Sequence, residues 1–185
     1  MKILKIALAV IVFLVLAGTG LYAYYGGFTK VNVRLASQGG ETVVYNEIIG
    51  DYSQSGLVMD TIYKYLKEKE QIVTTKGFGI YFDNPRKVKK SKLRSEAGCI
   101  IEAGDVAKVS TLTGDFKIKV LPKKQYIVAE FPYEGKLSIM VSIMKVYPSL
   151  KKYAEKNGFE TNGAVMEIYD IPNGQILYRE ELNKK

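Results

Sequence analysis

The chain has 185 residues and a formal net charge of +8, and it contains one cysteine and no histidine. That length is enough for one domain with a proper core. Without histidine, Ser-His and Cys-His catalysis and histidine-containing zinc sites are excluded, and one cysteine excludes an internal disulfide and a cysteine-rich metal site. We therefore expect no metal and no cofactor, and any acid–base chemistry must come from carboxylate, tyrosine or lysine side chains.

The N-terminal segment 1–29 is predicted to be a single-pass membrane anchor. Residues 6–29 carry no charge, and at ~1.5 Å per residue this run can cross a ~30 Å hydrocarbon core. Tyr22, Tyr24 and Tyr25 stand at its C-terminal end, where an aromatic belt belongs. A cleaved signal peptide is the alternative, but the run lacks a convincing small-residue cleavage site.

The charges that flank the anchor bear on its orientation. Lys2 and Lys5 precede it, whereas Lys30 and Arg34 follow it. Together with the N-terminal amine, this small bias favours a cytoplasmic N-terminus, which in a bacterium would put the domain on the periplasmic side. The Gly-Gly pair at 26–27 is expected to loosen the exit from the anchor.

The first half of the remaining chain predicts strand, helix, strand, strand. Residues 42–48 alternate with β-branched side chains, which is typical of a strand. Ser53 or Ser55 could cap the helix that follows. That helix has an apolar stripe at three- and four-residue spacing: Val58, Ile62, Tyr65 and Leu66. Further strands are expected at 77–83 and 98–103, the second containing Cys99 as a buried thiol.

Six basic residues gather between these two strands: Arg86, Lys87, Lys89, Lys90, Lys92 and Arg94. A cluster of this kind can contact phosphate on lipid or nucleic acid. We favour a solvated loop after Pro85. No aromatic residue interleaves the cluster to stack on bases, so we expect no nucleic-acid partner.

The second half predicts the same elements after a small, polar loop at 104–115. Strands are expected at 116–121 and 125–131, and a hairpin joins 164–169 to 175–182. The helix between them has a predicted core face: Met140, Ile143, Tyr147, Leu150 and Ala154. Pro148 predicts a kink, or a break into two helices, near Tyr147.

The two halves, about 31–103 and 116–182, thus repeat one pattern. Each ends in Ile-Tyr followed closely by Asp and Pro, with Tyr81 and Tyr169 in equivalent places. This predicts an α+β domain, 30–185, made of two pseudo-symmetric β-α-β-β repeats, with two helices on one face of a mainly antiparallel sheet. The seam between two such units is a natural place for a small-molecule site.

Three segments carry a resemblance to a known family: VVYNEIIGDY, GIYFDNP followed by KLRSEAG, and the terminal MEIYD. They resemble the GyrI-like small-molecule-binding domain, which is also the effector-binding domain of AraC- and MerR-type multidrug regulators. The resemblance covers residues 31–182. It implies a small-molecule ligand, and since no helix-turn-helix precedes the domain, it does not imply a transcription factor.

Further segments, YFDNP, FPYEGKLSI and VYPSLKKY, are similar to a membrane-anchored branch of this family, that of a testis-expressed endoplasmic-reticulum receptor of selective autophagy. That receptor continues into a long disordered tail with an autophagy-binding motif. This chain ends at Lys185, so we expect a short, prokaryotic relative of that branch without the receptor function.

The resemblance also implies a site. In GyrI-like domains a glutamate on the last-but-one strand lies between the repeats and neutralises cationic amphipathic ligands, and in a hydrolase branch that opens cyclopropane-bearing toxins it is catalytic. The MEIYD motif places Glu167 at this position. Its counterpart in the first half is Gly79, so the core does not require a carboxylate there.

A glutamate between Met166 and Ile168 and near aromatic rings would be poorly solvated. Desolvation raises its pKa and favours a bound cation, and aromatic walls add cation–π attraction. The alternative is that Glu167 faces solvent on an alternating strand. The candidate wall residues are Tyr45, Tyr52, Tyr81, Phe131, Tyr133 and Tyr169. Of these we predict Tyr52, Tyr81, Tyr133 and Tyr169 to bind ligand together with Glu167.

The sequence therefore predicts a membrane-anchored binder of cationic or amphipathic aromatic molecules. The alternatives are an anchored adaptor for protein partners, or a hydrolase of electrophilic cyclopropane-type toxins that uses Glu167. An open apolar cleft with Glu167 at its floor would favour binding, whereas a cleft plugged by side chains would favour the adaptor.

Overall fold

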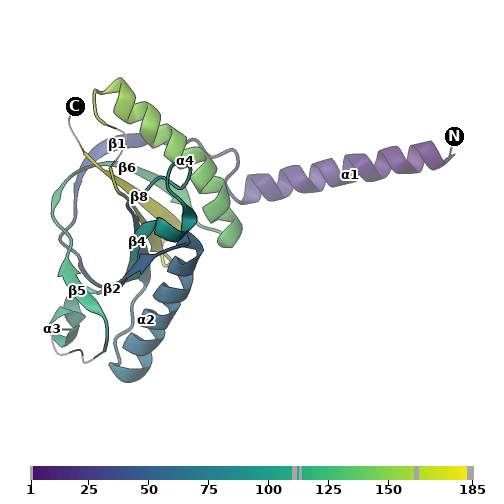
Figure 1. Cartoon of the computed structure of the whole chain (residues 1–185). Coiled ribbons are helices and arrows are strands. Elements are labelled where there is room, and N and C mark those ends of the chain that lie inside the picture. The colour runs from purple at the N-terminus through teal and green to yellow at the C-terminus, as the bar shows by residue number, and fades with distance from the viewer. Residues whose placement is uncertain (1, 110–111, 113, 161–162, 183–185) are drawn as a thin grey trace.

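The computed structural model describes residues 2–109, 112, 114–160 and 163–182. A long N-terminal helix, α1 (Lys2–Tyr24), leads into an α+β domain built on an antiparallel sheet (Figure 1). In the described part of the chain, α1 is the one helix long and apolar enough to cross a membrane, a criterion that a signal sequence also meets, and none of its residues is buried. The predicted fold class is confirmed.

Within the described residues the sheet has eight strands: β1 (Val33–Gln38), β2 (Thr42–Ile49), β3 (Lys76–Tyr81), β4 (Arg94–Ile100), β5 (Lys117–Val120), β6 (Lys124–Pro132), β7 (Val165–Asp170) and β8 (Gln175–Glu181). The α-helices after α1 are α2 (Ser55–Lys69), α3 (Val106–Val109) and α4 (Lys136–Lys156). Three short 3-10 turns are η1 (Tyr52–Gln54), η2 (Lys90–Lys92) and η3 (Ala103–Asp105). The strand predicted at 98–103 begins earlier, as β4, because its pairing with β2 and β3 starts at the basic segment.

The strand order is β1-β6-β8-β7-β3-β4-β2-β5, with every neighbouring pair antiparallel. The order is symmetric about β3 and β7 when β1, β2, β3 and β4 are matched with β5, β6, β7 and β8. Each half supplies the outermost strand of the other half's side of the sheet. This is the order that two related units predict, and superposition of 31–103 on 116–182 residue by residue stays a prediction.

Two helices cover the same side of the sheet (Figure 1). Ile62 and Leu66 of α2 pack with Val44 of β2 in one buried cluster. Leu150 and Ala154 of α4 pack in another cluster with strands β6 and β8. Burying a side chain of this size contributes about 1.5–3 kcal/mol. Because α2 packs on strands of the first half and α4 on strands of the second, a seam is left between the two helices.

The buried stripe of α4 differs from the predicted one. Its buried residues are Ser138, Ser142, Val146, Leu150 and Ala154, whereas two members of the predicted core face, Met140 and Ile143, are 63% and 45% exposed. The serines can be buried because they have partners: the Ser142 hydroxyl lies 2.5 Å from that of Tyr178, and the Ser138 hydroxyl accepts from the Glu134 amide at 2.7 Å. The apolar residues of the N-terminal half of α4 are thereby turned toward the seam.

Pro148 does not break α4. The helix is continuous from Lys136 to Lys156, so the predicted break into two helices is wrong, and the kink stays a prediction. The carbonyl that a residue at this position would normally bond belongs to Met144, which is 76% exposed. The packing of Val146 and Leu150 on either side of the proline holds the helix together.

The predicted cap of α2 is also wrong. Neither serine caps the helix: Gln54 stands at the N-cap without a side-chain hydrogen bond. The helical path begins a turn earlier, in η1, where the Asp51 carboxylate accepts from the Ser53 amide at 3.0 Å. Ser55 is instead buried, with 2% of its surface exposed.

The Gly-Gly pair at 26–27 holds the end of α1 rather than loosening it. Both glycines are buried, and a Cβ on Gly26 would lie 2.8 Å from the ring of Phe131 on β6. The Gly27 amide donates to the Tyr22 carbonyl at 2.7 Å, and the Gly27 carbonyl accepts from the Lys145 ammonium of α4. Glycine is needed here because side chains would prevent this close approach.

Candidate functional site

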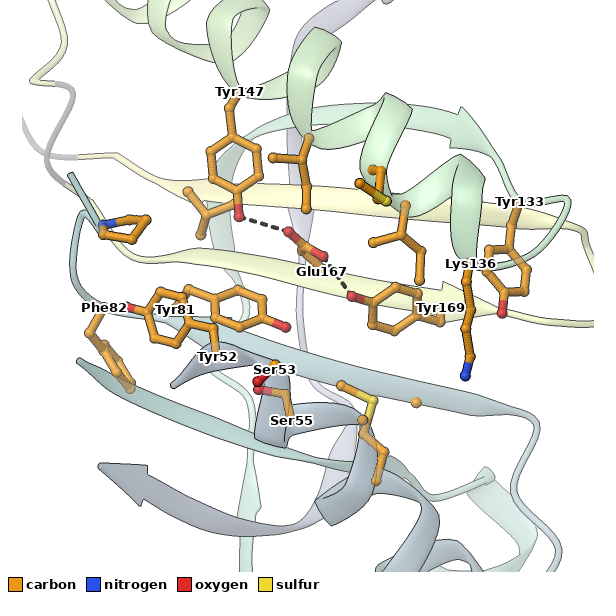
Figure 2. A pocket seen from close by; sticks show the side chains of 18 of the residues that line it. Tyr52, Ser53, Ser55, Tyr81, Phe82, Tyr133, Lys136, Tyr147, Glu167 and Tyr169 are labelled. Atoms are coloured by element: carbon orange, nitrogen blue, oxygen red, sulfur yellow. Dashed lines mark hydrogen bonds between the residues drawn. The ribbon is translucent and has the colours of Figure 1, made fainter. Parts of the chain in front are cut away.

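Glu167 lies at the middle of the sheet, on the face covered by the helices. Its Cα pairs with Gly79 of β3 on one side and Tyr178 of β8 on the other. The residue is 2% exposed. Its Oε1 accepts from the Tyr147 hydroxyl at 2.7 Å, and its Oε2 accepts from the Tyr169 hydroxyl at 2.6 Å (Figure 2). Each oxygen therefore has a donor.

Burial dominates the electrostatics of this group. It raises the pKa of Glu167 above its ordinary value, and the hydroxyls of Tyr169 and Tyr147 oppose the shift by donating to the ionised form. Burial and then the nearby carboxylate raise the pKa values of Tyr147 and Tyr169 well above the usual range. Both tyrosines stay protonated, so they remain donors at any ordinary pH.

Gly79 makes room for a third tyrosine beside the carboxylate. A Cβ at Gly79 would lie 2.7 Å from the hydroxyl oxygen of Tyr81. Without that Cβ, the Tyr81 ring lies over the strand and its hydroxyl points toward the space between Glu167 and Ser55 (Figure 2). Burial and then the charge of Glu167 raise the pKa of Tyr81 to about 12. Tyr81 is thus a further neutral donor at the cleft floor.

Two tyrosine pairs flank Glu167. The rings of Tyr52 and Tyr81 are 4.8 Å apart and those of Tyr133 and Tyr169 are 6.3 Å apart, both edge to face. The Tyr52 hydroxyl donates to the Asp83 carbonyl at 2.8 Å. The five residues predicted to bind ligand all line one cleft, and their role in binding stays a prediction.

The other two candidate wall residues do not face this cleft. Tyr45 is buried on the opposite face of the sheet, in a cluster with Val43 and Phe78, because it lies one position along β2 from the face that α2 covers. Phe131 is 1% exposed and lies in the core cluster under α4. The alternation phase, which the sequence does not set, turns Tyr45 to the far face of the sheet, whereas Phe131 is on the same face as Tyr169 but is covered by α4.

The cleft runs between α2 and α4 and encloses about 2020 Å³. Glu167 is at its floor (Figure 2). Its walls are largely apolar and include Met59, Tyr63, Ile139, Met140, Ile143 and Met144. Ligand sites are concave and mostly apolar, with a few polar groups that orient the ligand, and methionine side chains adapt to varied shapes. The cleft is therefore suited to bulky apolar molecules.

Sequence reasoning missed three polar groups of this cleft. Tyr147 was predicted to be core and instead donates to Glu167. The buried hydroxyl of Ser55 lines the cleft without a hydrogen-bond partner among the described residues. Glu180 of β8 also lines it. The rotation of α4 about its axis places Tyr147 in the cleft, and the point at which α2 begins places Ser55 there. Neither property can be predicted from hydrophobic periodicity.

Glu180 is the least compensated of these groups. It is 4% exposed, and within the described part of the chain its Oε2 has no hydrogen-bond partner. Burial raises its pKa from 4.5 to about 7. No sequence signal set Glu180 apart from the neighbouring Glu181, which pairs with Lys124.

Replacing Glu180 with glutamine should make the domain more stable at high pH. The folded state holds this proton more tightly than the unfolded chain between pH 4.5 and about pH 7, so the wild type loses stability as pH rises through that window. The difference in unfolding free energy, variant minus wild type, should grow by roughly 1–3 kcal/mol from pH 4 to pH 8. Urea denaturation across this range measures it. Glu130→Gln, at an exposed glutamate, is the control, and an equal pH trend there would contradict the assignment.

The described residues do not meet the needs of a metal site. In the ranges that the structure describes, no group of three or more cysteine, histidine or carboxylate side chains is arranged to hold a metal ion. The polar groups that do converge, at Glu167, are a carboxylate and tyrosine hydroxyls.

Comparison with known proteins finds relatives of this chain in sequence. The chain is 26% identical to mouse testis-expressed protein 264 homolog and 27% identical to human testis-expressed protein 264, in each case over 121 residues. These matches cover 62% of this chain and 37% of each relative, so the chain spans little more than a third of the length of the curated relatives it matches.

Solved structures share the fold at low identity. The C-terminal domain of EcmrR matches with a TM-score of 0.59 and 16% identity, over 84% of this chain and 99% of that one. The structure of SAV2435 bound to tetraphenylphosphonium matches with a TM-score of 0.50 and 9% identity, over 82% and 94%. The profile of the GyrI-like small molecule binding domain matches residues 34–180, and the chain therefore belongs to the GyrI-like family.

Proposed function

We propose that this domain binds lipophilic or amphipathic aromatic cations in the cleft between α2 and α4, with Glu167 as the counter-charge. The observation that carries the proposal is a carboxylate that is 2% exposed and forms no ion pair with any described residue. A buried charge without an opposite charge is costly. A bound cation would remove that cost.

The surroundings of Glu167 support an aromatic, lipophilic cation. Tyrosine rings on both sides of the carboxylate can offer their faces to a positive charge, and methionine and isoleucine side chains line the walls. Tetraphenylphosphonium, to which SAV2435 is bound in its structure of the same fold, has this chemistry. It is a suitable probe because its charge does not titrate.

We also infer that α1 anchors the domain to a membrane. The helix has 23 residues and a mean hydropathy of 2.5 over its most apolar window, and ~1.5 Å per residue gives it the length of a ~30 Å hydrocarbon core. The small charge bias around it favours the periplasmic side for the domain in a bacterium.

The open cleft weighs against the adaptor alternative, for which plugging side chains were the expected sign. A hydrolase remains the second candidate. One observation favours it: Glu167 has a raised pKa and lies beside protonated tyrosines, an arrangement that can transfer protons. Turnover of an electrophilic substrate that Glu167→Gln abolishes would establish it.

The proposed function is tested by calorimetric titration of the full chain, in nanodiscs, with tetraphenylphosphonium and with neutral triphenylphosphine oxide. Empty nanodiscs give the lipid contribution. The cation should bind at least tenfold more tightly than the neutral compound, because only the cation meets the carboxylate charge. Equal affinities, or no binding of the cation above empty nanodiscs, would refute the proposal.

A further inference from the structure

The helix α1 leaves the domain on the side of the cleft. Figure 1 shows α1 projecting from the side of the sheet that α2 and α4 cover, and residues of these two helices line the cleft. A bilayer that holds α1 would therefore face the helices rather than the far side of the sheet.

The connection between α1 and the domain leaves little slack. Gly26 and Gly27 are both buried, Gly26 lies against the ring of Phe131, and the Gly27 carbonyl accepts from the Lys145 ammonium on α4. Because this turn follows directly after the last residue of α1, Tyr24, the domain cannot move far from the membrane surface or turn its other face to it without breaking these contacts.

The rim of the cleft is apolar and exposed. Leu57 of α2 is 71% exposed, Met140 and Met144 of α4 are 63% and 76% exposed, and Ile171, after β7, is 55% exposed. All four line the cleft, and they come from three separate elements around its mouth. A cluster of this kind on a soluble surface marks an interaction site.

Basic side chains accompany this apolar rim. Lys136, at the start of α4, and Arg86 and Lys87, after β3, line the same cleft. Apolar side chains that enter the headgroup region, with lysine and arginine beside them, are the composition of a surface that lies on an anionic membrane. A protein partner would need no such relation to the exit of α1.

We propose that the rim formed by Leu57, Met140, Met144 and Ile171 rests on the bilayer that holds α1, so that the cleft takes lipophilic cations from the lipid rather than from water. This rests on the proposed function for the ligand and on the inferred anchor for the membrane. Lipophilic cations concentrate in bilayers, so a mouth at the lipid surface meets a far higher local concentration of them than a mouth in water.

The chain allows a direct test of this orientation. Its one native cysteine, Cys99, is 2% exposed and burial raises its pKa to about 11, so a fluorescent maleimide at neutral pH labels an introduced cysteine instead. Met140→Cys, on the rim, and Val120→Cys, on β5, provide matched positions because both residues are 63% exposed. The labelled full chains are reconstituted in phosphatidylcholine–phosphatidylglycerol vesicles, with or without nitroxide-labelled lipid.

Nitroxide lipid should remove most of the fluorescence of the label at position 140 and leave the label at position 120 nearly unchanged. Equal quenching at the two positions, or none at position 140, overturns the proposal, as does release of the chain by alkaline carbonate, which would mean that α1 is not inserted. No ligand is needed for this measurement. Failure of tetraphenylphosphonium to bind would therefore refute the proposed function and leave the orientation result standing.

Discussion

Replacing Glu167 with glutamine should weaken tetraphenylphosphonium binding by roughly 1.5–3 kcal/mol, which is about a 10- to 150-fold rise in Kd. The amide has the shape of the carboxylate. Its oxygen can still accept from one of the hydroxyls of Tyr147 and Tyr169, which lie at 2.7 and 2.6 Å, and its nitrogen can donate to the oxygen of the other. The main loss is the negative charge. Calorimetric titration of the two proteins in nanodiscs measures the change.

The pH dependence of cation binding distinguishes the wild type from the Glu167→Gln variant a second time. Because burial raises the pKa of Glu167, part of the wild type is neutral below that pKa, and cation affinity should rise as pH passes through it and then level off. The glutamine variant should show no such rise. Without ligand, the variant should be as stable as the wild type or more stable at high pH, since it removes a buried charge.

Glu130→Gln serves as the matched control. It removes the same charge from an exposed position on β6, where the carboxylate pairs with Arg34 at 2.9 Å. Affinity for the cation should not change. Wild-type binding and turnover in Glu167→Gln would remove Glu167 from any functional role and leave the adaptor function as the better explanation.

Replacing Gly98 with alanine should have the largest effect on stability. Gly98 lies on β4 between Tyr45 of β2 and Phe78 of β3. A Cβ there would lie 2.0 Å from the carbonyl oxygen of Val44 and 2.7 Å from the Cα of Tyr45. Both are backbone atoms of a paired strand, so relief requires the strands to separate. We expect a loss of about 3 kcal/mol or more in unfolding free energy.

Gly104→Ala is the control for this substitution. An added Cβ at Gly104 meets nothing within 4 Å, so the change in unfolding free energy should stay within about 0.5 kcal/mol. Thermal unfolding followed by near-ultraviolet circular dichroism of the tyrosines compares the two variants. Equal midpoints for Gly98→Ala and wild type would show that the strands tolerate the extra volume.

Much of the fold could be predicted from the alternation of residues along strands and from the glycine and proline residues that end strands and helices. The β-branched residues of 42–48 predicted a strand, and its consecutive residues Val43, Val44 and Tyr45 are apolar because β2 is buried on both faces by different clusters. Similar signals predicted the strands around Glu167. Periodicity predicted the existence of α4 but not its rotation. Its buried serines depend on partners distant in sequence or outside the helix, such as the Tyr178 hydroxyl, and hydrophobicity alone favours Met140 in their place.

The candidate site was predictable to the extent that it follows a motif. Glu167 and the tyrosines near it were predicted through a family resemblance together with the contrast to Gly79. Glu180 and Ser55 were missed because what sets them apart is the lack of a partner in a buried place. That property arises only when strands and helices from both halves are assembled.

The exchange of outer strands has a consequence for how the cleft can adapt. Because β1 pairs with β6 and β5 pairs with β2, the half that carries α2 and the half that carries α4 are linked by backbone hydrogen bonds at both margins of the sheet as well as at its centre. A hinge that swings the helices apart would have to break whole ladders. The span between the helices is therefore nearly constant, and ligands of different size must be accommodated by new rotamers of methionine and tyrosine side chains, which sets an upper limit on ligand width.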